Sequence, residues 1–333
     1  MSVNLRTFVI ANPRAGAGTV KEEWTLIERL LRTKIPELDY AFTEGPAHAT
    51  LLAREALRAG WEMVVSVGGD GTLNEVVNGF FEKPDANASY ELDADGWIAR
   101  KNAEPRPIHD KAVLGHVPLG TGGDFRRTIG LMGGLSETIE HLSGRHTRPI
   151  DVGQLAYLDH KDNLATRYFI NIASAGFAGQ VDHFTNGSWK GLGGTASFMA
   201  ASVRTYAMWK NVDLEVRLDE TEEIRDKMMN LVVANGEYFG GGMWVAPGAE
   251  IDDGEFQVVV MGDISKLESF EAIAGIYRGR HLSMRKVYRR RARQVAARAV
   301  DTKQPVLLDL DGEQPGRLPA MWNIHAGAIQ LKI

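Results

Sequence analysis

The strongest chemical signal in the 333-residue chain is a glycine-rich turn, composed of Gly68, Gly69, Asp70, Gly71 and Thr72. It follows an apolar run at 64–67 and leads directly into a segment with a helical pattern. Because glycine has no Cβ atom, main-chain N–H groups in such a turn can approach a phosphate closely. The N–H groups and the positive dipole end of the following helix point at the same place. The turn therefore predicts a phosphate-binding site.

Three side chains in and beside this turn carry further predictions. Thr72 and Glu75 have the spacing of a capping box, which we expect to fix the start of the helix. Asp70 has no evident folding role, and a carboxylate beside phosphates is suited to bind Mg²⁺ or to order water around it. The alternative is a tight strand–helix turn with an incidental aspartate, which the Asn-Glu-Val-Val-Asn-Gly run at 74–79 disfavours.

Two other glycine-containing turns also follow apolar strands. One spans 118–125 and contains Gly120, Thr121 and Asp124, and the other spans 12–18 and contains Asn12 and Arg14. Strand ends of one parallel sheet converge at the same edge, so the turns are expected to meet there. Arg14 is predicted to contact phosphate, with an exposed loop arginine as an equal alternative. Neither a Walker A motif nor the usual dinucleotide fingerprint is present, so the nucleotide must be held differently.

Alternating strand and helix patterns predict an α/β fold that begins with a parallel sheet. The expected strands are 7–11, 39–42, 63–67 and 113–117, and the helices are 20–31, 48–59 and a segment from 72. Beyond residue 148 strands follow one another closely, which predicts an antiparallel β-sandwich domain. Its expected strands are 150–158, 168–172, 212–218, 228–234 and 256–261, with helices at 194–208 and 265–277.

Two polar segments stand apart from this pattern. Residues 82–111 have three prolines and no steady period, and we interpret them as a surface insertion, either a plain loop or a flap. Residues 278–298 are dense in arginine, which predicts either a solvated face or a surface that docks on anionic lipid headgroups.

Composition restricts the classes of function. Hydrophobic residues make up 44% and charged residues 24%, as in ordinary globular proteins, and the net charge of −5 argues against a general nucleic-acid binder. There is no cysteine, which excludes disulfides, thiolate metal sites and cysteine nucleophiles. The first residues lack the pattern of a signal peptide, and no apolar run approaches the roughly 20 residues of a membrane span. A cytoplasmic location with transient membrane contact is expected.

The two motifs at 68–79 and 118–125 resemble the diacylglycerol kinase catalytic-domain family, and specifically its soluble bacterial lipid kinases. Sphingosine, ceramide and, more distantly, NAD kinases are relatives. The segments 171–177, 235–242, 246–247 and 252–254 resemble motifs of the family's C-terminal domain, as does the Asp-Gly-Glu at 311–313. Gly123 departs from the usual asparagine, Arg126-Arg127 replaces a small residue followed by arginine, and Gln180 replaces a common acidic residue.

The resemblance implies roles for several carboxylates. Asp311 is the candidate general base for the lipid hydroxyl, with Asp70 as its rival, and Asp70, Asp124 and Glu313 would build the Mg²⁺ and water network at the phosphates of ATP. It also implies a structural Mg²⁺ beside Asp253, completed by the main-chain carbonyls of Glu250 and Glu255. A simple turn at 252–254 is the alternative.

The family further implies a nucleotide-binding domain at 1–146 and 315–333, and a lipid-substrate sandwich domain at 147–314, with ATP in the cleft. The expected activity is ATP- and Mg²⁺-dependent phosphorylation of a lipid hydroxyl, most readily that of a diacylglycerol, at a membrane surface. The alternatives are a sphingoid base, another lipid or NAD as acceptor, and a catalytically silent lipid or nucleotide sensor. A homodimer is left open.

Overall fold

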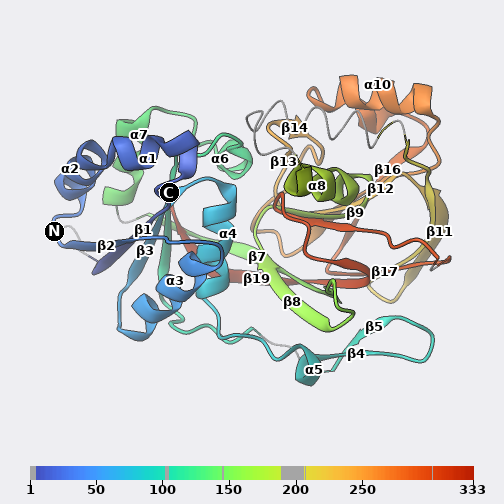
Figure 1. Cartoon of the computed structure of the whole chain (residues 1–333), viewed down its shortest axis with the longest axis horizontal. Helices are drawn as coiled ribbons and strands as arrows, with labels where there is room; N and C mark the ends of the chain where they lie inside the picture. The colour runs from blue at the N-terminus through green and yellow to red at the C-terminus, as the bar shows by residue number, and fades with distance from the viewer. Residues whose placement is uncertain (1–4, 102–104, 145, 189–205, 207, 302) are drawn as a thin grey trace. The chain divides into compact units, whose positions relative to one another are not determined.

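The computed structural model describes residues 5–101, 105–144, 146–188, 206, 208–301 and 303–333. The chain divides into two compact units (Figure 1). Unit 1 comprises Met1–Pro84, Glu104–Val152 and His325–Ile333, and unit 2 comprises Asp85–Ala103 and Gly153–Ile324. Among the described residues no helix has the length and hydropathy needed to cross a bilayer.

Unit 1 is built on a parallel sheet with the strand order β2-β1-β3-β6. The strands are β1 (Thr7–Ala11), β2 (Leu38–Phe42), β3 (Met63–Gly68) and β6 (Val113–Pro118). The last residues of β19 (Arg317–Lys332) add a parallel strand beside β6. Every residue of β3 and β6 is buried, as expected for central strands covered on both faces. The sheet positions the three turns that follow β1, β3 and β6.

Helices lie on both faces of this sheet (Figure 1). They are η1 (Ala15–Gly18), α1 (Thr19–Glu22), α2 (Trp24–Lys34), α3 (His48–Arg58), α4 (Asp70–Gly79), α6 (Asp124–Thr128), α7 (Leu135–Glu140) and η2 (His141–Ser143). The stripe Trp24, Ile27 and Leu31 of α2 recurs at helical spacing and packs into the same apolar cluster as Val9 and Val65 of the sheet. This burial fixes α2 against the strands that carry the turns.

Unit 2 is an antiparallel sandwich. One sheet has the order β16-β15-β12-β9-β18, and the other runs β11-β10-β17-β19 with β7 and β8 attached through β19. The strands of the first sheet are β9 (Ile172–Gly176), β12 (Asn230–Ala234), β15 (Phe256–Met261), β16 (Val287–Ala292) and β18 (Leu308–Leu310). Those of the second are β7 (Thr147–Leu158), β8 (Leu164–Phe169), β10 (Val212–Leu218), β11 (Glu222–Met228) and β17 (Gln294–Ala299).

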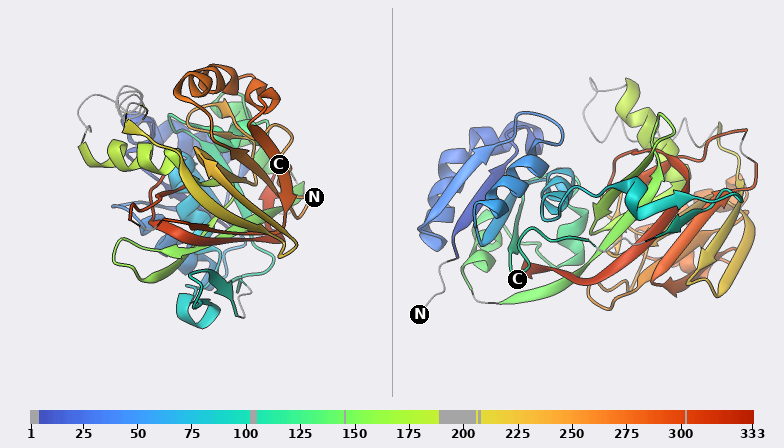
Figure 2. Two further views of the ribbon diagram at one scale, coloured as in Figure 1. Left: turned by 90° about the vertical axis from the view of Figure 1, so that its right-hand side faces the viewer. Right: turned by 90° about the horizontal axis from the view of Figure 1, so that it is seen from below.

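The core of unit 2 lies between its two sheets. Phe256 of β15 and Trp322 of β19 are fully buried in one cluster, and the Phe169 and Phe256 rings stack at 5.7 Å between centroids. The described residues of this unit also form α8 (Phe177–Ser188), α10 (Lys266–Ile276), the 3-10 helix η3 (Arg280–Ser283), and a short hairpin of β13 (Tyr238–Phe239) and β14 (Met243–Trp244). Figures 1 and 2 show α10 along the outside of the five-stranded sheet.

The predicted elements are largely confirmed. The strands at 7–11, 212–218 and 256–261 have the expected bounds. The helix expected at 20–31 is divided at Glu23 into α1 and α2, and the strand expected at 168–172 is divided between β8 and β9. Most of the helix expected at 194–208 lies outside the described residues.

The polar segment 82–111 is more ordered than a plain loop. It contains α5 (Ala86–Ser89) and a hairpin of β4 (Tyr90–Leu92) and β5 (Ile98–Arg100). Tyr90, Trp97 and Ile98 are buried in a cluster of unit 2, and the Tyr90 hydroxyl donates to Gln154 Oε1 at 3.0 Å. Three anchoring side chains in a 30-residue segment leave no periodic signal, so the sequence pattern missed this hairpin.

The division into units differs from the predicted domains at three places. Residues 85–103 group with unit 2 because their hairpin is anchored there. Residues 315–324 also group with unit 2, since the first part of β19 pairs with β17 through residues 320–323. The chain passes from unit 1 to unit 2 after Val152, within β7, rather than after residue 146.

Candidate active site

The three glycine-containing turns of unit 1 pack against one another. The Asn12 N–H donates to the Val67 carbonyl at 3.0 Å, and the Leu119 N–H donates to the Gly68 carbonyl at 2.8 Å. A Cβ atom placed on Gly120 would lie 2.3 Å from the Gly69 Cα. Only glycine at these two positions allows main chain to pass so close to main chain. The structure thus brings Asn12, Gly69 and Gly120 together, as the sequence predicted.

Side-chain hydrogen bonds connect the turn at 12–18 to the turn that follows β3. The Asn12 side-chain amide donates to Thr72 Oγ1 at 3.0 Å, while Asn12 Oδ1 accepts the Arg14 N–H at 3.0 Å. Gly68 packs onto Thr72, since a Cβ there would lie 2.7 Å from Thr72 Oγ1. Arg14 itself is exposed, and Gly71 lies in the first turn of α4.

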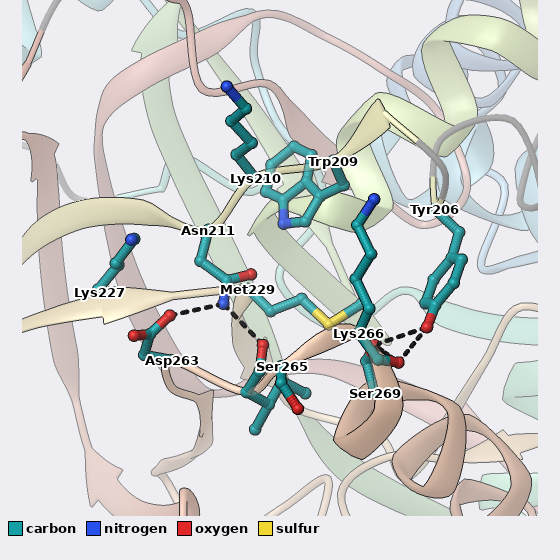
Figure 3. Close-up of a pocket in the computed structure, with 11 residues that line it drawn as sticks. Tyr206, Trp209, Lys210, Asn211, Lys227, Met229, Asp263, Ser265, Lys266 and Ser269 are labelled. Carbon is teal, nitrogen blue, oxygen red and sulfur yellow. Dashed lines mark hydrogen bonds between the residues drawn. The ribbon is translucent and has the colours of Figure 1, made fainter.

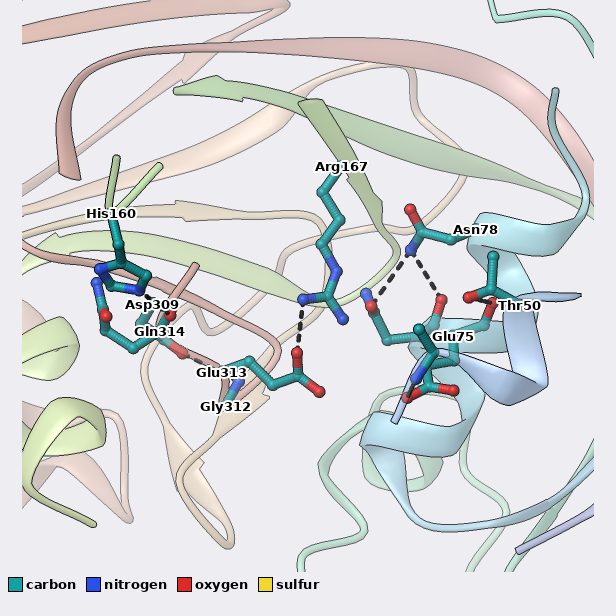
Figure 4. Close-up of polar contacts among 11 residues, drawn as sticks. Thr50, Glu75, Asn78, His160, Arg167, Asp309, Gly312, Glu313 and Gln314 are labelled. Carbon is teal, nitrogen blue, oxygen red and sulfur yellow. Dashed lines mark hydrogen bonds and ion pairs between the residues drawn. The ribbon is translucent and has the colours of Figure 1, made fainter. Parts of the chain in front are cut away.

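The predicted capping box at Thr72 and Glu75 is wrong. The helix α4 begins at Asp70 with Gly69 as its N-cap, and no side chain caps it. Glu75 instead serves α3: Oε1 accepts the Ala47 N–H at 2.8 Å, and Oε2 accepts the Ala49 N–H at 3.0 Å. Figure 4 shows Glu75 beside Thr50. Thr72 is taken up by Asn12, so spacing alone misidentified which helix the glutamate caps.

Asp70 joins the turn at 68–72 to the turn at 118–125. Its Oδ2 accepts the Asp124 N–H at 3.1 Å, and its Oδ1 accepts the Phe125 N–H at 3.2 Å. These donors are the first N–H groups of α6, which have no partner within the helix. The expectation that Asp70 has no folding role is therefore wrong, because its carboxylate caps α6.

The carboxylates of Asp70 and Asp124 face a shared space beside Gly122. A Cβ placed on Gly122 would lie 3.0 Å from Asp70 Oδ2 and 3.9 Å from Asp124 Oδ2. Two carboxylates around a space that only glycine leaves open match the hard oxygen donors that Mg²⁺ prefers. These residues fit a Mg²⁺ ion at the phosphates of a nucleotide.

Two basic residues near this space, Arg127 and His116, differ in their charge. Arg127 donates to the carbonyls of Gly122 and Gly123 at 2.6 and 2.7 Å, and its Nη1 lies 3.6 Å from Asp124 Oδ1, so it braces the turn. Burial lowers the pKa of His116 to about 4, although the charge of Asp70 opposes the shift. The imidazole is therefore neutral at pH 7 and does not offset the charge of Asp70. Sequence reasoning did not assign a role to Arg127, since it stood out only as a departure from the family pattern.

Unit 2 carries the second group of predicted residues, around Asp311. Asp311 lies in the left-handed region at φ 48°, and its Oδ1 accepts the Ile172 N–H at 2.9 Å. The Asp311 N–H donates back to the Ile172 carbonyl at 2.9 Å. The N–H groups of Asn235 and Gly236 both donate to the Asn171 carbonyl. The motifs at 171–177, 235–242 and 311–313 therefore meet in the described structure.

Glu313 forms an ion pair in this turn. Its Oε2 lies 2.5 Å from Arg167 Nη1, and Figure 4 shows the two side chains pointing toward each other. Arg167 was not predicted, because a single arginine on a strand gives no motif. The pair fixes Glu313 relative to β8.

A buried pair of aspartates supports the same turn. Asp309 Oδ1 accepts the Gly312 N–H at 2.9 Å, and Oδ2 accepts the Ser174 hydroxyl at 3.3 Å. Burial, and then the nearby charge of Asp182, raise the pKa of Asp309 well above its usual range, while burial raises the pKa of Asp182 to about 6. The raised pKa values favour the protonated form of this pair, whose two carboxyl groups are hydrogen-bonded to each other. The sequence signal that could have identified Asp309 is its position between Leu308 and Leu310, which places a carboxylate within an apolar strand.

The predicted structural metal site has a different positive partner. Asp253 Oδ2 lies 3.0 Å from Arg291 Nη1, and Glu255 Oε2 lies 3.7 Å from the same atom. Asp253 Oδ1 accepts the Glu255 N–H, and among the described residues no three His, Cys, Asp or Glu side chains group as metal ligands. The predicted main-chain carbonyl ligands of Glu250 and Glu255 are not tested by this grouping. The donor set does not require a metal, so a structural Mg²⁺ at these residues stays a prediction.

Comparisons with known proteins cover nearly the whole chain. Residues 6–155 match the diacylglycerol kinase catalytic domain, and residues 171–333 match the YegS C-terminal NAD kinase beta sandwich-like domain. The chain is 28% identical over 313 residues to a diacylglycerol kinase of Staphylococcus haemolyticus, covering 94% of this chain and 83% of that protein. It is 27% identical over 317 residues to the diacylglycerol kinase of Staphylococcus saprophyticus, covering 94% and 90%.

Solved structures share the fold. A diacylglycerol kinase from Bacillus anthracis matches with a TM-score of 0.68 at 20% identity, over 100% of this chain and 98% of that one. Yeast NADH kinase, solved with NADH, matches with a TM-score of 0.51 at 12% identity, over 98% and 82%. With the catalytic-domain match over the three turns and the sandwich match over the Asp311 motifs, the chain belongs to the diacylglycerol kinase catalytic-domain family.

Proposed function

We propose that the protein is a lipid kinase that transfers the γ-phosphoryl group of ATP to the hydroxyl of a lipid, with a diacylglycerol as the preferred acceptor and Mg²⁺ as cofactor. The observation that carries this is the Asp70 carboxylate, which joins two glycine-containing turns and faces Asp124 across Gly122. The names of the relatives support the choice of acceptor.

Unit 1 supplies the phosphate half of the proposed reaction. The N–H groups at the start of α4 and the glycine turn before it would bind the phosphates, with the helix dipole favouring their charge. Asp70 and Asp124 would hold the Mg²⁺, which when bound neutralises charge on the transferred phosphoryl group. Arg127 keeps the Gly122 turn in place through its two carbonyl contacts.

Unit 2 supplies the proposed proton acceptor. Ile172 orients the Asp311 carboxylate by donating its N–H to Oδ1. Asp309 holds the turn at 311–313 by accepting the Gly312 N–H. Asp311 would take the proton of the lipid hydroxyl as its oxygen attacks phosphorus. Asp70 is the rival for this role. Because both Asp70 oxygens already accept main-chain N–H groups at α6, we assign Asp70 to binding and Asp311 to proton transfer.

The test is to incubate the protein with labelled ATP, Mg²⁺ and a panel of diacylglycerol, monoacylglycerol, phosphatidylglycerol, a sphingoid base, a prenol and NAD. We expect labelled phosphatidic acid from diacylglycerol. Label on NAD alone would refute the lipid kinase and support the alternative acceptor, and no label on any acceptor would support a silent sensor. An Asp124→Asn variant should lose the product, while Asp213→Asn, an exposed aspartate on β10, should retain it.

A further inference from the structure

The helix α10 carries apolar side chains on its outer face. Leu267 is 84% exposed, Phe270 68%, Tyr277 56% and Ile273 40%. Their spacing of three and four residues places them, with exposed Ala274, on one stripe of the helix. Contiguous exposed apolar side chains on a surface helix mark an interaction site more often than scattered ones do.

The core does not account for this stripe. The inward face of α10 consists of Ser269, Ala272 and Ile276, which are buried, and the last two pack into the cluster over β12 and β15. The helix start is separately fixed by Ser265, whose hydroxyl accepts the Glu268 N–H in a capping box. The helix is thus held without its outer apolar residues.

Basic residues border one side of the stripe. From 266 to 289 the chain has six basic and two acidic residues, within a protein of net charge −5. Lys286 reaches Glu268 at 3.0 Å, and Arg280 lies against Gly275, where an added Cβ would be 3.3 Å from the Arg280 Cβ. The basic side chains that are exposed along this border are Lys266, Arg278, Arg280, Arg285, Lys286 and Arg289.

A lysine-lined pocket lies at the start of α10. It measures about 270 Å³, and its lining includes Lys210, Lys227 and Lys266 but a single acidic residue, Asp263 (Figure 3). The Asp263 carboxylate accepts the Asn211 side-chain amide at 2.9 Å. The positive border therefore continues past the first turn of α10.

The second half of the arginine-rich segment is committed elsewhere. Arg290 pairs with Glu222 at 2.9 Å, Arg291 pairs with Asp253, and Arg298 pairs with Glu215 at 2.6 Å. These contacts match the solvated-face interpretation of that half. In the first half of the segment, which directly follows α10, Arg278, Arg280 and Arg285 are exposed.

We propose that the outer face of α10 docks on a bilayer that contains anionic lipids, with Leu267, Phe270 and Tyr277 entering the boundary between headgroups and acyl chains. Apolar residues flanked by lysine and arginine are the pattern by which surface helices bind such membranes. A second copy of the chain fits less well, because a two-fold interface would bring the two basic borders together. This proposal deepens the proposed function. Binding to the bilayer does not depend on kinase activity, but its purpose, access to a lipid substrate, rests on the proposed function.

The direct test is co-sedimentation of the full chain with phosphatidylcholine vesicles that contain phosphatidylglycerol, and with vesicles of phosphatidylcholine alone. We expect binding to the anionic vesicles that weakens with salt. The double variant Leu267→Glu with Phe270→Glu should bind on the order of 30-fold more weakly, since two apolar side chains no longer insert. Leu92→Glu changes a residue that is 51% exposed on β4, and this control should bind as the wild type does.

Two further measurements separate the explanations. The double variant should keep its rate on a short-chain diacylglycerol dissolved in water and lose it on diacylglycerol in anionic vesicles. If no lipid is phosphorylated under either condition, the proposed function fails, while vesicle binding still decides the docking. Unchanged vesicle binding by the double variant would refute the proposal, as would a wild-type dimer in analytical ultracentrifugation that the double variant dissociates.

Discussion

The contact between Asp70 and the start of α6 allows a quantitative prediction. In Asp70→Ala the N–H groups of Asp124 and Phe125 lose a charged acceptor. Hydrogen bonds to a charged group contribute about 1.5–3 kcal/mol each, but Asp70 is only half-buried and water can replace part of the loss. We therefore expect local stability at α6 to fall by about 2 kcal/mol, a factor of about 30 in the opening equilibrium.

Amide hydrogen exchange followed by mass spectrometry measures this directly. Peptides that cover 124–128 should exchange about 30-fold faster in Asp70→Ala, and less so in Asp70→Asn, which keeps one acceptor oxygen. Asp39→Ala is the matched control, because Asp39 is exposed and its carboxylate accepts the N–H of the neighbouring Tyr40 at 3.1 Å. Unchanged exchange at 124–128 in Asp70→Ala would refute the claim that Asp70 joins the two turns.

Three other predictions concern the remaining contacts. Gly120→Ala should weaken ATP binding measured by calorimetry, because the added methyl group would lie 2.3 Å from the Gly69 Cα and push the two turns apart. An unchanged affinity for ATP would contradict the claim that close packing of these turns forms the phosphate site. Burial raises the folded pKa of Asp182 to about 6, so the stability that Asp182 contributes should fall as pH rises from about 4 to about 6. Urea unfolding of Asp182→Asn should show a shallower slope, because Asp309, whose pKa burial also raises, still contributes; an equal slope in both proteins would refute the role of Asp182. The predicted structural Mg²⁺ at Asp253 requires that EDTA lower the wild-type Tm and that MgCl₂ restore it; an unchanged Tm would contradict that site and leave Arg291 as the cation that pairs with Asp253.

The sequence predicted the elements whose residues repeat a clear period or end at glycine. The strands before the turns and the sandwich strands are of this kind, and the turn motifs identified the residues near Asp70 and Asp311. What it could not predict depends on partners distant in the chain. Glu75 matches a capping box in spacing, yet α3, some 26 residues earlier, supplies its N–H donors.

The same reason explains the residues that were missed. Arg167 meets Glu313 across 146 residues, and Asp309 faces Asp182 from a different element. No local pattern marks either contact, because each depends on how the sandwich sheets and α8 pack. The hairpin at 90–100 was missed because Tyr90 and Trp97 stand alone among polar neighbours.

The central claim is that Asp311 accepts the lipid hydroxyl proton in a Mg²⁺- and ATP-dependent kinase. The most direct measurement is the single-turnover rate of labelled lipid formation by Asp311→Asn, with ATP binding measured on the same sample. Loss of a general base should lower the rate by about 10²–10⁴-fold while the affinity for ATP stays that of the wild type. A near-wild-type rate in Asp311→Asn would contradict the account and return Asp70 to the role of base.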